Sequence, residues 1–286
     1  MSDANSIHRA LAETYDQLAT EYARVVAPVY RPLAKRLLQL IDLRPGWRVL
    51  DAGTGTGLLA LLAAPRVTQT GAVIGVDASE QMRARARARA AQFGFSQCDF
   101  RVGDLHALDF PANHFNAILS QFALHYTEPA KSLAEFFRVL APAGMLALHI
   151  WALDSSAPHK KMYEVLPPYR VNEETDTLAH LRAQAARSYL FRQTFGTPAQ
   201  IQSALAFAGF ANVEARAETH PARVANTDAF LELAHASPLL RAEIFAMPEQ
   251  ARTEYLRAAR AALREFETPQ GFAWTFNTIA ITAHKS

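Results

Sequence analysis

Three glycines at alternate positions follow a carboxylate at the end of an apolar run. Asp51 closes that run, and Gly53, Gly55 and Gly57 come directly after it. Glycine permits the positive φ angles of a tight turn and lets a ligand approach bare backbone. A helix-like segment begins at Leu58, and the N-terminus of a helix offers unpaired N–H groups to a ligand. The stretch therefore predicts a strand, a ligand-binding turn and the start of a helix.

The spacing of the glycines separates two classes of ligand. It is G-x-G-x-G, whereas dinucleotide-binding turns have G-x-G-x-x-G. Leu58 occupies the position that the third dinucleotide glycine would need. Asp51 would repel a pyrophosphate, but it suits a ligand that carries a cation nearby. A nucleotide-cofactor oxidoreductase therefore stays open only as a less favoured alternative.

Two further acids follow predicted strands. Asp77 closes the next apolar run, twenty positions after Gly57. A carboxylate at such a strand end can accept hydrogen bonds from both ribose hydroxyls of a nucleoside. Its alternative role is to cap the helix that begins near Ser79. Asp104 follows the third strand, and taken alone it reads as a solvated loop carboxylate.

Candidate catalytic side chains are few. His125 lies just after the fourth strand and is the candidate general base, although a lone histidine is more often structural. No cysteine cluster, H-x-x-x-H pair or acid spacing typical of a metal site occurs, so we expect no metal. No G-x-S-x-G elbow for acyl transfer occurs either.

Alternating strands and helices must position these residues. Apolar runs and helical periodicity predict an α/β fold with a parallel sheet and helices on both faces. On such a sheet, ligands bind at the carboxyl ends of the strands. The predicted strands are 47–51, 72–77, 99–102, 115–120 and 145–151, and the helices between them are 58–64, 79–93 and 129–140.

The remaining segments flank or interrupt this alternation. One amphipathic helix carries Leu11 to Val25, and a second begins near Pro32. Residues 152–197 and about 219–268 break the sheet rhythm and are rich in aromatic side chains. The arginines from Arg83 to Arg89 alternate with alanine, and we interpret them as the solvated faces of a surface helix.

Composition excludes several classes of partner. The 286 residues carry a formal net charge of +2, which gives no electrostatic case for nucleic acid. The single cysteine, Cys98, cannot form an internal disulfide, and this favours a reducing compartment. No leader opens the sequence and no apolar run approaches the ~20 residues of a membrane span. We expect a cytoplasmic protein; nothing in the sequence fixes its oligomeric state.

Together these motifs resemble the class I S-adenosylmethionine-dependent methyltransferases, in particular the small-molecule branch of the quinone-biosynthesis C-methyltransferases. The resemblance covers roughly residues 10–151 and includes Asp77-Ala78-Ser79-Glu80-Gln81-Met82, similar to the family's D-x-S-x-x-M. It implies a Rossmann-like sheet and the cofactor S-adenosyl-L-methionine. The cofactor-binding residues it implies are Tyr15, Tyr22, Asp51, Gly53, Thr54, Gly55, Gly57, Asp77, Ala78, Met82, Asp104, Leu105, Ser120 and Gln121.

The resemblance implies the activity, and the two breaks in the sheet rhythm predict the organisation around it. We expect a single domain in which two lid insertions cover the carboxyl ends of the strands, with methyl transfer to a small, apolar or aromatic acceptor. A non-catalytic protein that binds the cofactor to stabilise a partner is the alternative. The expected parts are a helical cover (1–44), a cofactor-binding half (45–151), lid insertions (152–197 and 219–268) and the end of the sheet (198–218 and 269–286).

Overall fold

One mixed sheet organises the protein, whose computed structural model describes residues 2–172 and 175–286. The strand order is β3-β2-β1-β4-β5-β8-β6, and β7 pairs with β8. The pairs from β3 to β5 are parallel, whereas β8 is antiparallel to both β5 and β6. The strands are β1 (Arg48–Ala52), β2 (Ala72–Asp77), β3 (Cys98–Val102), β4 (Phe115–Gln121), β5 (Leu140–Trp151), β6 (Phe210–Val224), β7 (Glu267–Thr268) and β8 (Gly271–Lys285).

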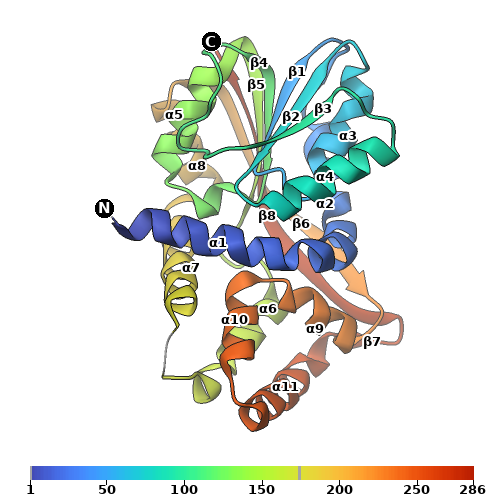
Figure 1. Ribbon diagram of the computed structural model, residues 1–286, viewed down its shortest axis with the longest axis vertical. Coiled ribbons are helices and arrows are strands. Elements are labelled where there is room, and N and C mark those ends of the chain that lie inside the picture. Colours follow the sequence, from blue (N-terminus) through green and yellow to red (C-terminus); the bar gives the residue numbers. More distant parts are fainter. Residues whose placement is uncertain (1, 173–174) are drawn as a thin grey trace.

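Helices cover both faces of the sheet and build a second, helical half below it (Figure 1). In Figure 1, α1 crosses the molecule between the sheet and that helical half. The α-helices are α1 (Ser2–Glu21), α2 (Ala27–Gln39), α3 (Leu58–Val67), α4 (Glu80–Gln92), α5 (Pro129–Val139), α6 (Ala157–Glu164), α7 (Asp176–Phe195), α8 (Pro198–Phe207), α9 (Thr227–His235), α10 (Pro238–Ala246) and α11 (Glu249–Leu263). Short turns are the π-helix η1 (Tyr22–Val26) and the 3₁₀ turns η2 (Leu124–Tyr126), η3 (Pro167–Tyr169) and η4 (Arg264–Phe266).

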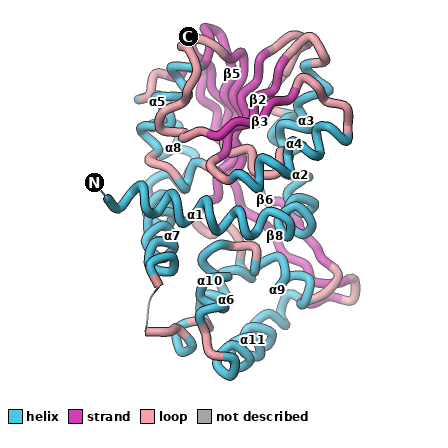
Figure 2. Tube along the Cα trace, in the orientation of Figure 1, coloured by secondary structure: helices cyan, strands magenta, loops and turns pink. Residues whose placement is uncertain are grey.

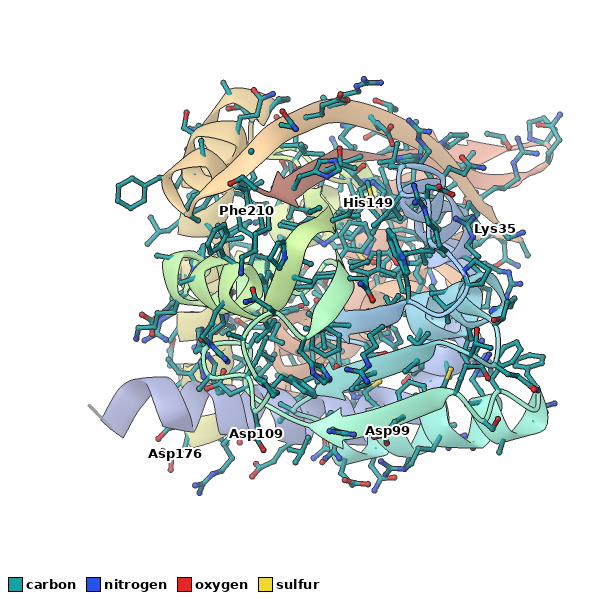
Figure 3. All side chains as sticks on the ribbon, turned by 90° about the horizontal axis from the view of Figure 1, so that it is seen from above. Lys35, Asp99, Asp109, His149, Asp176 and Phe210 are labelled. Carbon is teal, nitrogen blue, oxygen red and sulfur yellow. The ribbon has the colours of Figure 1, made fainter. Side chains whose placement is uncertain are left out.

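Successive residues of the central strand enter opposite hydrophobic layers, as the two-residue period of a strand requires. Val49 belongs to the layer under α3 and Leu50 to the layer under α5, and both are fully buried. Burying a side chain of this size contributes about 1.5–3 kcal/mol. A third cluster, around Phe230 and Tyr255, forms the core of the helical half. Figure 3 shows side chains filling the space on both sides of the sheet.

The N-terminal segment differs from the expectation of a helix that begins anew near Pro32. The helical run is continuous from Ser2 to Gln39, with the π-helix η1 in its middle and Pro32 inside α2. Proline there removes a single backbone hydrogen bond. The burial of Leu33 and Leu37 against the sheet compensates for that loss.

The second expected insertion begins later than 219. Strand β6 continues to Val224, which pairs with Phe272 of β8. Pro221 is tolerated because β6 is an edge strand, where a missing N–H need not break a ladder. Figure 2 shows β6 and β8 running together past the rest of the sheet into the helical half. Residues 173–174 of the first expected insertion lie outside the described residues.

Within the described residues, no helix combines the length and the apolar character needed to cross a membrane.

Candidate functional site

The glycine turn at the carboxyl end of β1 adopts the conformation that its sequence predicts. Gly53, Gly55 and Gly57 have φ angles of 75°, 51° and 79°. A Cβ added at Gly53 would lie 2.3 Å from the Cβ of Ala123, so a side chain is excluded there. A Cβ at Gly55 would meet nothing within 4 Å. The backbone at Gly55 therefore faces open space, where a ligand can approach it.

Asp51 caps the helix that follows this turn. Its Oδ2 accepts hydrogen bonds from Thr54 Oγ1 (2.7 Å) and from the backbone N–H of Ala60 (3.0 Å). Burial raises the pKa of Asp51 to about 7. The carboxylate thus fixes the turn to α3, a structural task that the sequence did not indicate.

Asp77, at the end of β2, points both carboxylate oxygens toward backbone. Oδ2 accepts from Gly55 N–H (2.8 Å) and Oδ1 from Ser79 N–H (2.9 Å). Ser79 is the N-cap of α4, because its Oγ accepts from the N–H of Met82 at 3.2 Å. The alternative role of Asp77 as that cap is therefore wrong. Each oxygen keeps a lone pair for a ligand, and the exposed Ala78 leaves the approach open.

The loop after β3 holds the next two expected residues. Asp104 is exposed; its Oδ1 accepts from the N–H of His106 (2.9 Å) and lies 2.7 Å from that residue's Nδ1. Leu105 is buried in the layer under α5. The ring of His8, on α1, stacks on His106 with centroids 5.2 Å apart. The cover helix therefore lies directly on this loop.

Ser120 and Gln121 end β4 with different contacts. Ser120 Oγ donates to the carbonyl of Ala52 at 2.7 Å, which ties β4 to β1. Gln121 Nε2 is buried and has no hydrogen-bond partner in the part of the chain that the structure describes. Of the two side chains, Gln121 carries the donor left for a ligand.

An acid that the sequence did not single out joins α1 to this edge of the sheet. Asp16 Oδ1 accepts from Ser79 Oγ (2.5 Å) and from the backbone N–H of Gln81 (2.9 Å). On the polar face of an amphipathic helix, such an acid is indistinguishable from a solvated one. The first turn of α4 is thus covered by α1.

A cavity of about 1030 Å³ lies between the strand ends, α1 and the helical half. Both tyrosines expected from the sequence line it, and α6, α7 and α10 contribute to its wall. Its aromatic lining includes Tyr15, Tyr22, Tyr30, Tyr126, Tyr163 and Trp151. A cavity of this size accepts a small molecule.

Tyr22 links the cavity to the end of β2. Burial, and after it the neighbouring Tyr30, Tyr126 and Asp77, raises the pKa of Tyr22 well above its ordinary value. The phenol is therefore close enough to Asp77 to feel its charge while it also faces the cavity. Tyr22 therefore lies between Asp77 and the cavity, although neither the glycine turn nor Asp77 is among the residues that line the cavity.

His125 lines the cavity, as a candidate base should. It is 6% exposed, and its Nδ1 has no hydrogen-bond partner among the residues described. Burial, and after it the charge of Arg192, lowers the pKa of His125 to about 3. The imidazole is neutral at pH 7 and is a weak proton acceptor there.

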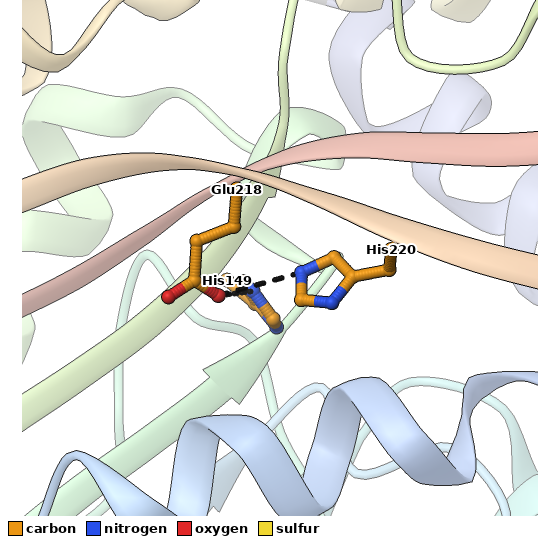
Figure 4. A group of neighbouring side chains, drawn as sticks. All are labelled: His149, Glu218 and His220. Atoms are coloured by element: carbon orange, nitrogen blue, oxygen red, sulfur yellow. Dashed lines mark ion pairs between the residues drawn. The ribbon is translucent and has the colours of Figure 1, made fainter.

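A second cluster brings together side chains that the sequence keeps about seventy positions apart. His149 on β5 and the pair Glu218 and His220 on β6 offer ligand atoms within 4.8 Å of one another (Figure 4). Thr278 Oγ1 lies 3.1 Å from the Nε2 atoms of both histidines. Arg36 donates to Glu218 through Nε (2.9 Å) and through a second nitrogen. No sequence motif predicts this cluster, because only the pairing of strands distant in sequence brings its residues together.

Hydrogen bonds account for three of the six side-chain nitrogens and oxygens of the cluster, and His149 Nδ1 is buried without a partner among the described residues. A metal ion between the imidazoles would have to displace the hydroxyl of Thr278, and Arg36 already neutralises Glu218. Glu218 Oε2, 3.4 Å from His220 Nε2, makes no hydrogen bond with the described residues. We interpret the cluster as a polar network that joins β5, β6, β8 and α2.

Comparison with known proteins gives consistent results. A family model described as "Methyltransferase domain" matches residues 49–144. Nocamycin O-methyltransferase of Saccharothrix syringae is 33% identical over 224 residues, which cover 76% of this chain and 78% of that protein. The 2-phytyl-1,4-naphtoquinone methyltransferase of Thermosynechococcus vestitus is 28% identical over 218 residues, which cover 75% of this chain and 93% of that protein.

Solved structures share the fold at low sequence identity. The YcgJ protein of Bacillus subtilis superposes with a TM-score of 0.57 at 20% identity, and the match covers 88% of this chain and 97% of that one. The [4+2]-cyclase SpnF superposes with a TM-score of 0.56 at 19% identity, and the match covers 96% of this chain and 95% of that one. Because a cyclase shares the fold, the fold alone does not determine the reaction.

Proposed function

Because the chain belongs to the class I S-adenosylmethionine-dependent methyltransferases, we propose that it methylates a small aromatic or apolar molecule held in the cavity beside Tyr22. The two relatives described above are named as methyltransferases, which favours methyl transfer over the oxidoreductase alternative. The observation that carries the proposal is the cavity of about 1030 Å³, which is lined by aromatic rings that include the expected cofactor residues Tyr15 and Tyr22.

The residues at the strand ends fit S-adenosylmethionine. Gly55 presents bare backbone to open space, and Gln121 offers a buried amide donor without a partner among the described residues. Asp77 would hold the ribose hydroxyls with its remaining lone pairs. Asp104 would accept a hydrogen bond from the adenine amino group, as the resemblance implies. Met82, buried in the first turn of α4, would lie near the adenine.

When bound, the cofactor supplies a methyl group already activated by its sulfonium. The protein's task is then to position the acceptor and exclude water. Tyr15 and Tyr22 line the cavity, and aromatic faces favour a nearby cation. The helix α1, which carries Tyr15, is bonded to the first turn of α4 through Asp16.

The names of two relatives support the class of acceptor. One is named for nocamycin and one for a naphthoquinone. Phe122 and Trp151, whose stacked rings have centroids 3.7 Å apart, both line the cavity, and aromatic side chains favour packing against an aromatic acceptor.

The test is a transfer assay with a panel of small phenols and hydroxyquinones, read as formation of S-adenosylhomocysteine. Ala185 lines the cavity, so Ala185→Phe should raise KM for any accepted phenol about tenfold or abolish its turnover. The matched control is Ala186→Phe, at an exposed neighbouring position. Both variants should bind S-adenosylhomocysteine like the wild type. Transfer that Ala185→Phe leaves unchanged would place the acceptor outside the cavity.

A further inference from the structure

One cation in the cavity lacks a counter-ion. Of the three Lys and Arg side chains that line the cavity, two have carboxylate partners. Lys160 lies 4.0 Å from Asp154, and Arg170 lies 3.4 Å from Glu243. For the guanidinium of Arg192 the structure shows neither an ion pair nor a hydrogen bond to any described residue.

The surroundings of Arg192 are polar but uncharged. Burial, opposed by the phenols of Tyr126, Tyr163 and Tyr189, lowers the pKa of Arg192, and its charge in turn lowers the pKa of His125. The side chain is partly buried, and a charge removed from water is costly unless it is paired.

The position of Arg192 on its helix does not supply the missing partner. It lies in the last turn of α7, where a cation interacts favourably with the helix dipole. That effect is worth about 0.3–1 kcal/mol at an exposed site. No hydrogen bond joins the guanidinium to a terminal carbonyl among the described residues. The dipole therefore does not explain why the side chain faces the cavity.

The two histidines that line the cavity, His125 and His159, are weak bases, and this also favours an anionic acceptor. Burial lowers the pKa of His159 to about 4, and that of His125 is about 3 for the reason given above. Neither imidazole readily takes a proton at pH 7. An acceptor that is already ionised when it binds requires no proton removal inside the cavity.

We propose that Arg192 forms an anion-binding subsite, and that the acceptor is a weak acid bound as its anion, with a carboxylate or a comparably acidic enol or phenol paired to the guanidinium. This inference rests on the proposed function, because it assigns the charge of the molecule that the cavity accepts. The pair would be charge-assisted and partly shielded from water, which makes it stronger than an exposed ion pair.

A pair of fluorescent probes tests the charge separately from the aromatic surface. The probe 1-anilinonaphthalene-8-sulfonate is an anion, and N-phenyl-1-naphthylamine is the same skeleton without the sulfonate. Both are titrated into the protein with S-adenosylhomocysteine present. Arg192→Gln should weaken binding of the sulfonate about tenfold and change binding of the amine less than twofold. Arg187→Gln, which removes the same charge from an exposed arginine of α7 that does not line the cavity, should change neither probe more than twofold.

Three outcomes would overturn the subsite: an equal loss for both probes, no loss for the sulfonate, or no binding of the sulfonate to the wild type. Unchanged binding of the amine shows that the variant keeps a folded cavity. Calorimetry with S-adenosylhomocysteine separates this inference from the proposed function. If the protein binds S-adenosylhomocysteine but Arg192→Gln affects the two probes equally, only the subsite is contradicted. If the protein does not bind S-adenosylhomocysteine, the proposed function is contradicted.

Discussion

The hydroxyl oxygens of Tyr15 and Tyr126 lie 2.8 Å apart although 111 positions separate them in the sequence. Tyr15 belongs to the cover helix α1 and Tyr126 to the turn η2 after β4. Their rings meet edge to face with centroids 6.0 Å apart. This contact and the bonds of Asp16 to the start of α4 hold α1 over the strand ends.

Removing one hydroxyl should loosen this cover. Tyr15→Phe deletes the bond to Tyr126 at a cost of about 0.5–1.5 kcal/mol. We expect faster hydrogen exchange in α1 and faster release of S-adenosylhomocysteine, by several-fold, because α1 covers the proposed cofactor site. The control is Tyr30→Phe, since Tyr30 makes no hydrogen bond with the described residues. If exchange in α1 is unchanged by Tyr15→Phe, the hydroxyl pair does not hold the helix.

Asp77 should dominate cofactor affinity. Asp77→Ala removes the acceptor proposed for both ribose hydroxyls, and each charge-assisted bond is worth about 1.5–3 kcal/mol. The affinity for S-adenosylmethionine, measured by calorimetry, should fall at least tenfold. Asp99→Asn removes an exposed carboxylate from the neighbouring strand and serves as the control. If Asp77→Ala binds the cofactor as tightly as the wild type, the carboxylate of Asp77 has only a structural role. That role is to accept the backbone hydrogen bonds of Gly55 and Ser79.

His125 should make stability depend on pH in a defined direction. Its folded pKa of about 3 lies below the ordinary value of 6.5. As the pH falls below 6.5, the unfolded chain binds a proton that the folded protein does not. The free energy of unfolding therefore decreases from pH 6.5 toward pH 4, by at most about 1.4 kcal/mol per unit from this group.

Urea unfolding between pH 7 and 4 provides the measurement. His125→Asn should lose stability less steeply than the wild type as the pH falls. The comparison of slopes is needed because Asp51, with its pKa raised to about 7, acts in the opposite direction over this range. Parallel slopes for the two proteins would show that His125 titrates normally when folded.

Chelation should leave the protein intact. The cluster of His149, Glu218 and His220 is explained by its bonds to Thr278 and Arg36, and sulfonium chemistry needs no Lewis acid. After exhaustive treatment with a chelator, we expect unchanged Tm and unchanged methyl transfer. A fall in Tm that Zn²⁺ reverses in the wild type but not in His149→Asn would show instead that the cluster binds metal.

Sequence reasoning predicted the cofactor half of the fold well, because local signals determine it. Strand β2 has the expected bounds, and the turn from Gly53 to Gly57 has the expected positive φ angles. The interpretation of the arginine helix as solvated holds for the exposed Arg85 and Arg87 and is wrong for Arg83, which is 7% exposed, and for the half-buried Arg89. Arg89 donates to the carbonyl of Thr56 at 3.1 Å and Arg85 donates to Thr20 of α1. An arginine that binds a distant carbonyl looks the same in sequence as one in water.

The parts that sequence reasoning missed depend on pairing between distant segments. The extension of β6 to Val224 requires β8 as its partner, and it includes Pro221, a residue type that is uncommon inside strands. The cluster around His149 and the counter-ion of Arg170 likewise bring together residues from different elements. No pattern within a single segment reports such contacts.

The length of β6 and β8 has a consequence for how an acceptor is selected. Their ladder runs from Phe210 opposite Lys285 to Val224 opposite Phe272, and α9, α10 and α11 lie in the chain between these two strands. The strands and helices share the hydrophobic cluster of Phe230, Phe272 and Trp274. That half of the cavity wall is therefore preformed. When an acceptor matches the shape of this wall, the protein loses little conformational entropy on binding it. Discrimination among acceptors therefore depends on their fit to the preformed wall and little on a rearrangement of the protein around each of them.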